Sequence, residues 1–235
     1  MEIPHPRWKE LYRIGGVASL LIAALVVFAV AAFFIWPFTP GLASVEDIFS
    51  ILHTDRLGGL MSLDLPLLVI TILGILPTLA LYAALHPVNR SSAFAALVLG
   101  LIGVVALIPA RPLAELVLLS DRFAATPGEP ERMRLLAAGE TLLALFNGTA
   151  WILYALCNGT SALISSLLML RSRFFSRTAA YSGILSGLGG IGAVVPVAGP
   201  IFALFATFGG ILWYALAGRA LLSIPTVSSS SIPES

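Results

Sequence analysis

The stretch GGVASLLIAALVVFAVAAFFIW, residues 15–36, contains no charged side chain and is long enough to cross a membrane as one helix. The hydrocarbon core of a bilayer needs about 20 apolar residues per helix. Pro37 and Pro40 follow the stretch, and prolines stop helices. The apolar run is too long for a signal peptide and no small-residue cleavage site follows it, so we expect a retained membrane-spanning helix over residues 14–36.

The composition of the whole chain is that of an integral membrane protein. Of its 235 residues, 58% are hydrophobic and only 11% are charged, with a mean hydropathy of +0.99, whereas about a quarter of a soluble domain is charged. This excludes an ordinary soluble enzyme, and a net charge of +1 leaves no basic surface for nucleic acid. One cysteine permits no internal disulfide, and the three histidines are too scattered for a metal motif. We expect no cofactor and no nucleic-acid partner.

Five further apolar runs follow the first one. They cover residues 57–85, 93–120, 147–171, 178–196 and 198–222, and the six runs together occupy about two thirds of the chain. The sequence therefore predicts an all-α, polytopic bundle of six transmembrane helices over residues 14–222. A cytoplasmic segment, residues 1–13, precedes the bundle, and a Ser/Pro-rich tail, residues 223–235, is expected to be disordered. Little is left for an extramembrane domain.

The distribution of Lys and Arg predicts the orientation, because these residues are enriched in cytoplasmic loops. With the N-terminus inside, eight cations fall on the inner side and four on the outer side. The inner ones are Arg7, Lys9, Arg13, Arg90, Arg171, Arg173, Arg177 and Arg219, and the outer ones are Arg56, Arg122, Arg132 and Arg134. We expect both termini on the cytoplasmic side of the membrane.

The segment between the first two spans has a helical pattern of its own. Residues 44–53, SVEDIFSILH, place four apolar side chains on one face of a helix (Val45, Ile48, Phe49 and Leu52). This predicts a short amphipathic helix lying on the outer surface of the membrane. Residues 121–130 carry turn residues and predict an outer loop, while residues 131–146 are helical in pattern.

Four ionisable residues lie within or beside the predicted spans: Asp64, Arg111, Glu115 and Glu140. A charge in the membrane is costly unless it is paired or hydrated, so each is a functional candidate. All four fall in the outer third of the membrane when the spans are measured at 1.5 Å per residue. Arg111 and Glu115 are spaced i, i+4, which favours a structural ion pair. Alternatively, Asp64 caps the helix that starts at Leu65-Pro66.

A polar stripe runs along the fourth span. Glu140, Asn147, Trp151, Tyr154, Asn158, Ser161 and Ser165 recur at helical spacing. In a functional interpretation, the stripe and the four charges line a polar pocket that opens to the outer side. The candidate pocket residues are Asp64, Arg111, Glu115, Glu140, Asn147, Trp151, Tyr154 and Asn158. In a structural interpretation, the stripe provides hydrogen bonds between helices.

Prolines and glycines predict where helices bend or pack closely. Pro66 and Pro77 are expected to bend the second span, and Pro109 with Pro112 to break the third. The glycines between residues 183 and 192 permit close helix packing, and Gly199-Pro200 predicts a tight outer turn between the last two spans.

Three segments resemble a bacterial family of integral membrane proteins, the domain-of-unknown-function family 4386. They are LLAAGETLLALFNGTAW (135–151), SSLLMLRSRFFSRTAAYSGILSG (165–187) and WYALAGRAL (213–221). The resemblance extends over residues 11–222 and is sharpest over residues 135–187. It implies a six-helix membrane domain and a bacterial origin, and it transfers no catalytic residue because the family has no assigned activity.

Three functions remain open at this point. The first is a non-enzymatic binding, accessory or regulatory component, with membrane lipid and other membrane subunits or a small molecule as partners. The second is a small-molecule or lipid transporter or binding bundle, although no inverted repeat is evident. The third is an intramembrane metal-dependent hydrolase that uses Glu140, Asp64 or Glu115 with His53. The sequence contains no nucleophile–base set, so we assign no catalytic residue.

Overall fold

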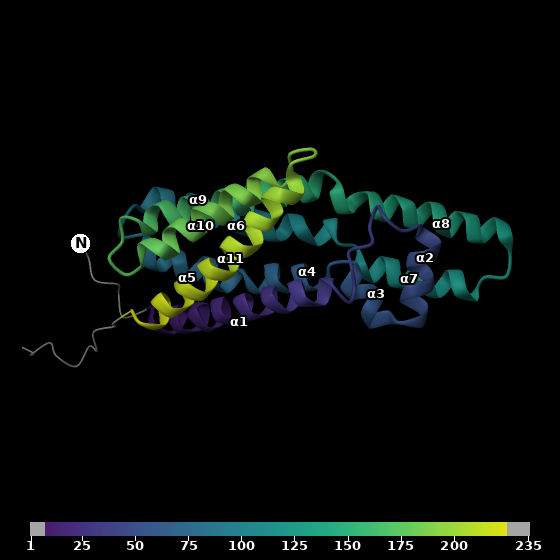
Figure 1. The fold of residues 1–235 in the computed structure, drawn as a ribbon, viewed down its shortest axis with the longest axis horizontal. Coiled ribbons are helices and arrows are strands. Elements are labelled where there is room, and N and C mark those ends of the chain that lie inside the picture. Colours follow the sequence, from purple (N-terminus) through teal and green to yellow (C-terminus); the bar gives the residue numbers. More distant parts are fainter. Residues whose placement is uncertain (1–7, 225–235) are drawn as a thin grey trace, which may run out of the picture. The chain divides into compact units, whose positions relative to one another are not determined.

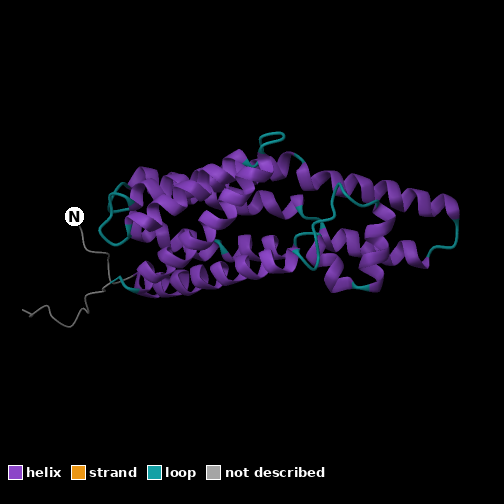
Figure 2. Cartoon of the chain, viewed as in Figure 1, coloured by secondary structure: helices purple, strands orange, loops and turns teal. Residues whose placement is uncertain are grey.

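The computed structural model describes residues 8–224, and this part of the chain consists of helices and loops without a strand (Figures 1 and 2). The all-α prediction is confirmed. In chain order the helices are α1 (Lys9–Phe33), α2 (Val45–Thr54), α3 (Arg56–Ser62), α4 (Leu65–Leu73), α5 (Ile75–Leu85), α6 (Arg90–Ala110), α7 (Leu113–Ala125), α8 (Glu129–Ala144), η2 (Leu145–Asn147), α9 (Thr149–Met169), α10 (Arg177–Gly192) and α11 (Gly199–Leu222). The predicted disordered tail lies outside the described residues beyond Ile224.

The chain forms two compact units. Unit 1 contains Met1–Ala24, Ile72–Val104 and Ala155–Ser235, and unit 2 contains Leu25–Thr71 and Val105–Tyr154. Each unit has its own hydrophobic core.

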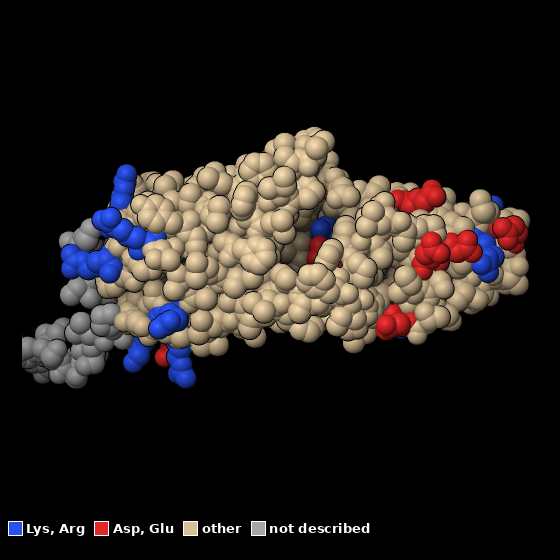
Figure 3. All heavy atoms as spheres, in the orientation of Figure 1, with Lys and Arg blue, Asp and Glu red and all other residues tan. Residues whose placement is uncertain are grey.

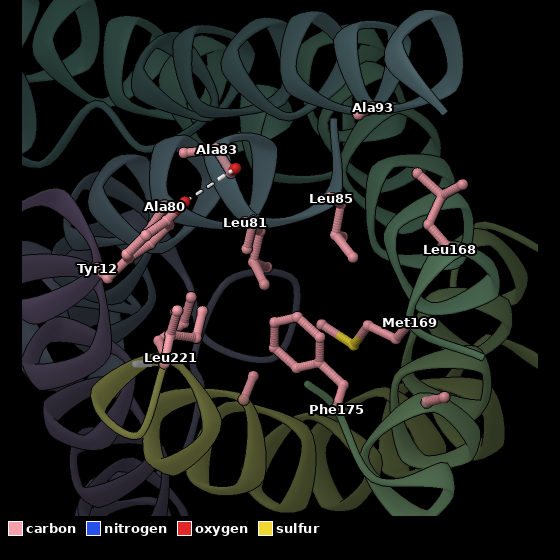
Figure 4. Packing of buried hydrophobic residues seen from close by; sticks show 14 of the residues in the cluster. Tyr12, Ala80, Leu81, Ala83, Leu85, Ala93, Leu168, Met169, Phe175 and Leu221 are labelled. Carbon is pink, nitrogen blue, oxygen red and sulfur yellow. Dashed lines mark hydrogen bonds between the residues drawn. The ribbon is translucent and has the colours of Figure 1, made fainter. Parts of the chain in front are cut away.

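The core of unit 1 is built from α1, α5, α6, α9, α10 and α11 (Figure 4). Its largest side chains are aromatic, aliphatic and sulfur-containing ones, among them Leu85, Met169, Phe175 and Leu221. Tyr12 is also buried there, and its hydroxyl donates to the carbonyl oxygen of Ala83 at 3.1 Å. A buried hydroxyl needs such a partner, because leaving it unpaired would cost about 1–3 kcal/mol.

Five helical segments are long and apolar enough to cross a membrane: Lys9–Phe33, Leu65–Leu85, Arg90–Ala125, Glu129–Met169 and Gly199–Leu222. The protein is therefore an integral membrane protein, but the predicted number of six spans is not confirmed. The segment expected over residues 178–196 forms only the 16-residue helix α10. At 1.5 Å per residue this helix is about 24 Å long, which is shorter than the roughly 30 Å hydrocarbon core.

Helix breaks divide the two longest segments. Arg90–Ala125 has 36 residues and Glu129–Met169 has 41, so each would extend well beyond a bilayer as one straight helix. Breaks after Ala110 and before Thr149 leave α6 and α9 with 21 residues each. The α4–α5 segment, Leu65–Leu85, also has 21 residues. Three segments of about 31 Å therefore match the thickness of the hydrocarbon core.

Unit 2 contains a helical cap with a hydrophobic core of its own. We define the cap as α2, α3, α7 and α8. Its core contains Phe49, Leu52, Leu116 and Phe123, with Leu135 from α8. The cap is formed by chain outside the three 21-residue segments.

The amphipathic helix α2 has the apolar face that the sequence predicts, but other helices of the protein cover that face. Val45, Ile48, Phe49 and Leu52 are all buried, and α2 packs against α3, α7 and α8. Protein side chains therefore bury this face, which corrects the prediction of a helix lying on the membrane surface. The predicted loop over residues 121–130 is also shorter than expected, because α7 continues to Ala125 and α8 starts at Glu129.

The close packing of α10 against α11 yields a test of the fold. A Cβ atom added to Gly189 would lie against the backbone nitrogen of Ala206 and 2.7 Å from the carbonyl oxygen of Phe202. Gly189→Ala should therefore lower the free energy of unfolding by about 1–3 kcal/mol, because backbone cannot move aside cheaply. Gly210→Ala is the control, since its new methyl group meets only the Ser186 hydroxyl at 3.3 Å. Equal thermal unfolding temperatures of the two variants in detergent would contradict this packing.

Candidate functional site

Three helix interruptions occur in unit 2, and each has a local cause. Asp64 lies between α3 and α4 with a φ of 72°, a backbone conformation uncommon for a residue with a side chain. Pro109 lies inside the last turn of α6, which ends at Ala110, and Pro112, which has no amide hydrogen, precedes α7. Between α8 and α9 the chain tightens into the short helix η2 and then becomes extended at Gly148. The predicted break at Pro109 and Pro112 is thus confirmed.

The Arg111 side chain contacts all three interruptions. Its Nε and Nη2 atoms donate to Oδ2 of Asp64 at 3.1 and 3.0 Å. Its Nη1 atom donates to the carbonyl oxygens of Ala110 at 2.9 Å and Phe146 at 3.1 Å. Carbonyl groups at helix ends lack partners within their own helix. The Arg111 guanidinium supplies hydrogen bonds to two such carbonyl groups, those of Ala110 and Phe146, and forms an ion pair with Asp64 at the third interruption.

Aromatic rings enclose the same guanidinium. Its Cζ atom lies 4.9 Å from the ring centroid of Phe146 and 4.7 Å from that of Trp151, within the range of cation–π attraction. Trp151 in turn packs on Tyr154, with 5.4 Å between ring centroids. Arg111 is only 4% exposed, and a charge buried to this degree requires pairing. We call Asp64, Arg111, Phe146, Trp151 and Tyr154 the Arg111 junction.

The structure divides the predicted pocket residues into three groups. Asp64, Arg111, Trp151 and Tyr154 belong to the junction. Glu115, Glu140 and Asn147 are exposed on unit 2, and within residues 8–224 the side chains of these three make no hydrogen bond or ion pair. Asn158 lies in unit 1 beside Gly103. Within unit 2 the structure thus brings together four of the predicted residues, Asp64, Arg111, Trp151 and Tyr154.

The predicted Arg111–Glu115 pair is wrong, because Arg111 pairs with Asp64. The i, i+4 contact needs a continuous helix, whereas α7 starts only at Leu113, after Arg111 and Pro112. The alternative that Asp64 caps α4 holds only for its backbone. The Asp64 carbonyl accepts from the amide of Leu67 at 3.1 Å, while its carboxylate accepts from Arg111.

The polar stripe is interrupted because α8 and α9 are not one continuous helix. η2 and Gly148 separate them, so helical spacing no longer relates Glu140 in α8 to the stripe residues of α9. Of the buried stripe residues, Ser161 donates to the carbonyl oxygen of Ala96 in α6 at 2.6 Å. The structural interpretation, hydrogen bonds between helices, is therefore confirmed at Ser161.

A shallow groove in the cap was not predicted from the sequence. It has a volume of about 360 Å³ and lies between α2, α7 and the start of α8. Its lining residues are Glu46, Asp47, Phe49, Ser50, His53, Thr54, Ser120, Phe123, Ala124 and Arg132, none of which is among the predicted pocket residues. The guanidinium of Arg132 lies 4.0 Å from the Phe123 ring centroid and 3.6 Å from a Glu46 carboxylate oxygen. The apolar spacing of Leu113, Leu116 and Phe123 could have indicated that α7 covers α2.

Metal ligands do not cluster in the described part of the chain. Within residues 8–224 no three His, Cys, Asp or Glu side chains come close enough together to hold a metal ion. His53, which the hydrolase hypothesis requires, lines the groove of the cap, whereas Asp64 belongs to the Arg111 junction.

The Arg111 junction predicts a large difference between two arginine substitutions. Arg111→Ala should reduce stability by about 3–5 kcal/mol, because it leaves the Asp64 carboxylate and two carbonyl oxygens without their donor. Arg56→Ala is the matched control, since its ion pair with Asp121 is exposed on both sides and worth at most about 1 kcal/mol. Thermal unfolding in mild detergent measures both. Similar losses in the two variants would show that the junction contributes little.

Comparison with known proteins identifies the chain only at the level of a family. A family model described as "Domain of unknown function (DUF4386)" matches residues 56–224. No curated protein and no solved structure matches. The matched region contains α3 to α11 and therefore all the residues of the Arg111 junction. This chain thus belongs to the DUF4386 family, whose function is unknown.

Proposed function

We propose that this protein is a non-enzymatic binding or accessory component of the bacterial cytoplasmic membrane. In this proposal both termini lie in the cytoplasm, and the cap lies on the outer side, where it recognises a partner. The single observation that carries the proposal is the cap itself, which has its own hydrophobic core and a charged groove.

The charges of the two units support this orientation. The described part of unit 1 contains seven Lys and Arg but one acid, Glu10, and the cations gather where α1 and α6 begin (Figure 3). They are Lys9, Arg13, Arg90, Arg171, Arg173, Arg177 and Arg219. Unit 2 contains nine Asp and Glu and five Arg. An excess of Lys and Arg marks the cytoplasmic side, so the cationic end of unit 1 is assigned to the cytoplasm.

The groove supports a role in recognition. Its walls combine carboxylates, an imidazole, hydroxyls and the guanidinium of Arg132 over an aromatic ring. Binding sites combine apolar floors with a few polar groups that fix orientation, and Arg and aromatic residues are enriched in protein interfaces. A second membrane subunit or a secreted protein with a polar surface fits this lining best.

The orientation can be tested by cysteine labelling in intact cells. Cys157 is first replaced by Ser, and single cysteines are then introduced at the exposed positions Ala125 in the cap and Ser91 at the start of α6. A membrane-impermeant maleimide should label Ala125→Cys in intact cells and Ser91→Cys only after permeabilisation. The reverse pattern would place the cap in the cytoplasm and contradict the proposed orientation.

Recognition by the cap can be tested with a photo-crosslinking amino acid in the native host. We expect discrete protein adducts from Ser50, which lines the groove, and from the exposed Met133 of α8. Phe208, which is exposed on α11 among apolar residues, is the control that reports nonspecific membrane neighbours. Adducts from the cap that are absent or identical to those from Phe208 would contradict a binding role for this surface.

A further inference from the structure

The cationic end of unit 1 has far more positive than negative charge. All seven of its described Lys and Arg are exposed, and the described part of this unit contains a single acid. The segments that carry these cations meet at one place, because residues next to the cations belong to one buried cluster (Figure 4), among them Tyr12, Leu85, Met169, Phe175 and Leu221. Unit 1 therefore presents a basic surface for an anionic partner.

The densest part of this surface is the connection between α9 and α10. Residues 171–177, RSRFFSR, contain three exposed arginines. The connection is held from inside unit 1, since Phe175 is buried with its ring beside Met169 (Figure 4). It is also held by the hydroxyl of Ser176, which accepts from the amide of Ala179 at 3.1 Å. The backbone that carries the arginines is thus ordered in advance, which lowers the entropic cost of binding.

One exposed face of α10 continues from these arginines. Arg177, Tyr181, Leu185 and Leu188 follow one another at helical spacing and lie on one side of the helix. Tyr181 is 59% exposed, Leu185 44% and Leu188 50%. Along the helix this face offers a cation, then an amphipathic ring, then two aliphatic side chains. A phospholipid presents the complementary groups in the same order: a phosphate, the glycerol region and an acyl chain.

The lengths of the neighbouring helices fit this arrangement. α9 has 21 residues and ends at Met169, so Arg171 follows a segment of about 31 Å, close to the thickness of the hydrocarbon core. α6 has the same length and begins at Arg90, at the same end. A cation just beyond the end of a segment of this length meets lipid phosphates when the segment crosses a membrane, and tyrosine is enriched at that level.

We infer that residues 171–177 and the exposed face of α10 bind an anionic phospholipid of the surrounding leaflet. Arg171 and Arg177 pair with its phosphate, Tyr181 lies against the glycerol region, and Leu185 and Leu188 contact an acyl chain. A guanidinium can donate two parallel hydrogen bonds to a phosphate. A zwitterionic headgroup adds a cation that the basic surface repels, so a lipid with net negative charge is preferred. The inference is independent of any partner of the cap.

Lipid retention by the purified full-length chain tests this site. Protein in nanodiscs that contain equal amounts of phosphatidylglycerol and phosphatidylcholine, with the same acyl chains, is transferred to mild detergent, and native mass spectrometry counts the retained lipids. We expect an excess of phosphatidylglycerol. The double variant Arg171→Gln/Arg177→Gln should reduce this excess at least about fivefold, because one arginine near an anionic surface contributes a factor of about five. Arg122→Gln, which removes an exposed arginine of the cap, is the control and should retain the excess.

A second pair of variants separates lost binding from lost folding. Arg177→Lys keeps the positive charge and should retain most of the excess that Arg177→Gln loses, whereas a purely structural defect would not follow the charge. Equal retention of the two lipids by the wild-type protein would overturn the inference.

Two further results would also contradict it. A loss of the excess in Arg122→Gln as large as in the double variant would show that the net charge of the chain is sufficient. Displacement of phosphatidylglycerol by millimolar inorganic phosphate would identify a site for soluble phosphate compounds. Retention in detergent does not depend on which side of the membrane the cap occupies, so a failure here is distinguishable from a failure of the proposed function.

Discussion

The structure of unit 2 depends on one constraint: helix ends at a membrane boundary must find hydrogen-bond partners without free access to water. Arg111 meets this constraint at the three interruptions where the chain passes from the 21-residue segments into the cap. Its planar guanidinium can donate several hydrogen bonds in fixed directions, and it uses four of them on one carboxylate and two carbonyl groups. A lysine carries the same charge but cannot reproduce this geometry.

Helix length is the second constraint. The α4–α5 segment, α6 and α9 have the same number of residues and match the hydrocarbon core. Each of them ends next to a residue that Arg111 contacts. The junction therefore lies at the ends of these segments, and a buried ion pair at a segment end is less costly than one at the middle of a span.

Much of the fold could be predicted from the sequence, because it depends on local patterns. The apolar runs predict helices in a membrane, the spacing of Val45, Ile48, Phe49 and Leu52 predicts the buried face of α2, and Pro109 with Pro112 predicts the break after α6. The partners of these features could not be predicted in the same way. Asp64 and Arg111 are 47 residues apart, and no local pattern relates them. The polar stripe assumed a continuous helix, whereas Gly148 interrupts it, and hydropathy over residues 178–196 did not reveal how short α10 is.

The alternation of the two units along the chain has a consequence for biogenesis. Unit 2 is assembled from two separate stretches, and its second stretch ends only at Tyr154. During synthesis at the ribosome, Asp64 leaves the exit tunnel before Arg111, so its carboxylate is already available when the arginine enters the translocon. Pairing with Asp64 neutralises Arg111, which lowers the cost of a charge beside the apolar helix α6. The carbonyl of Phe146 and the ring of Trp151 are synthesised last and complete the enclosure of the Arg111 guanidinium.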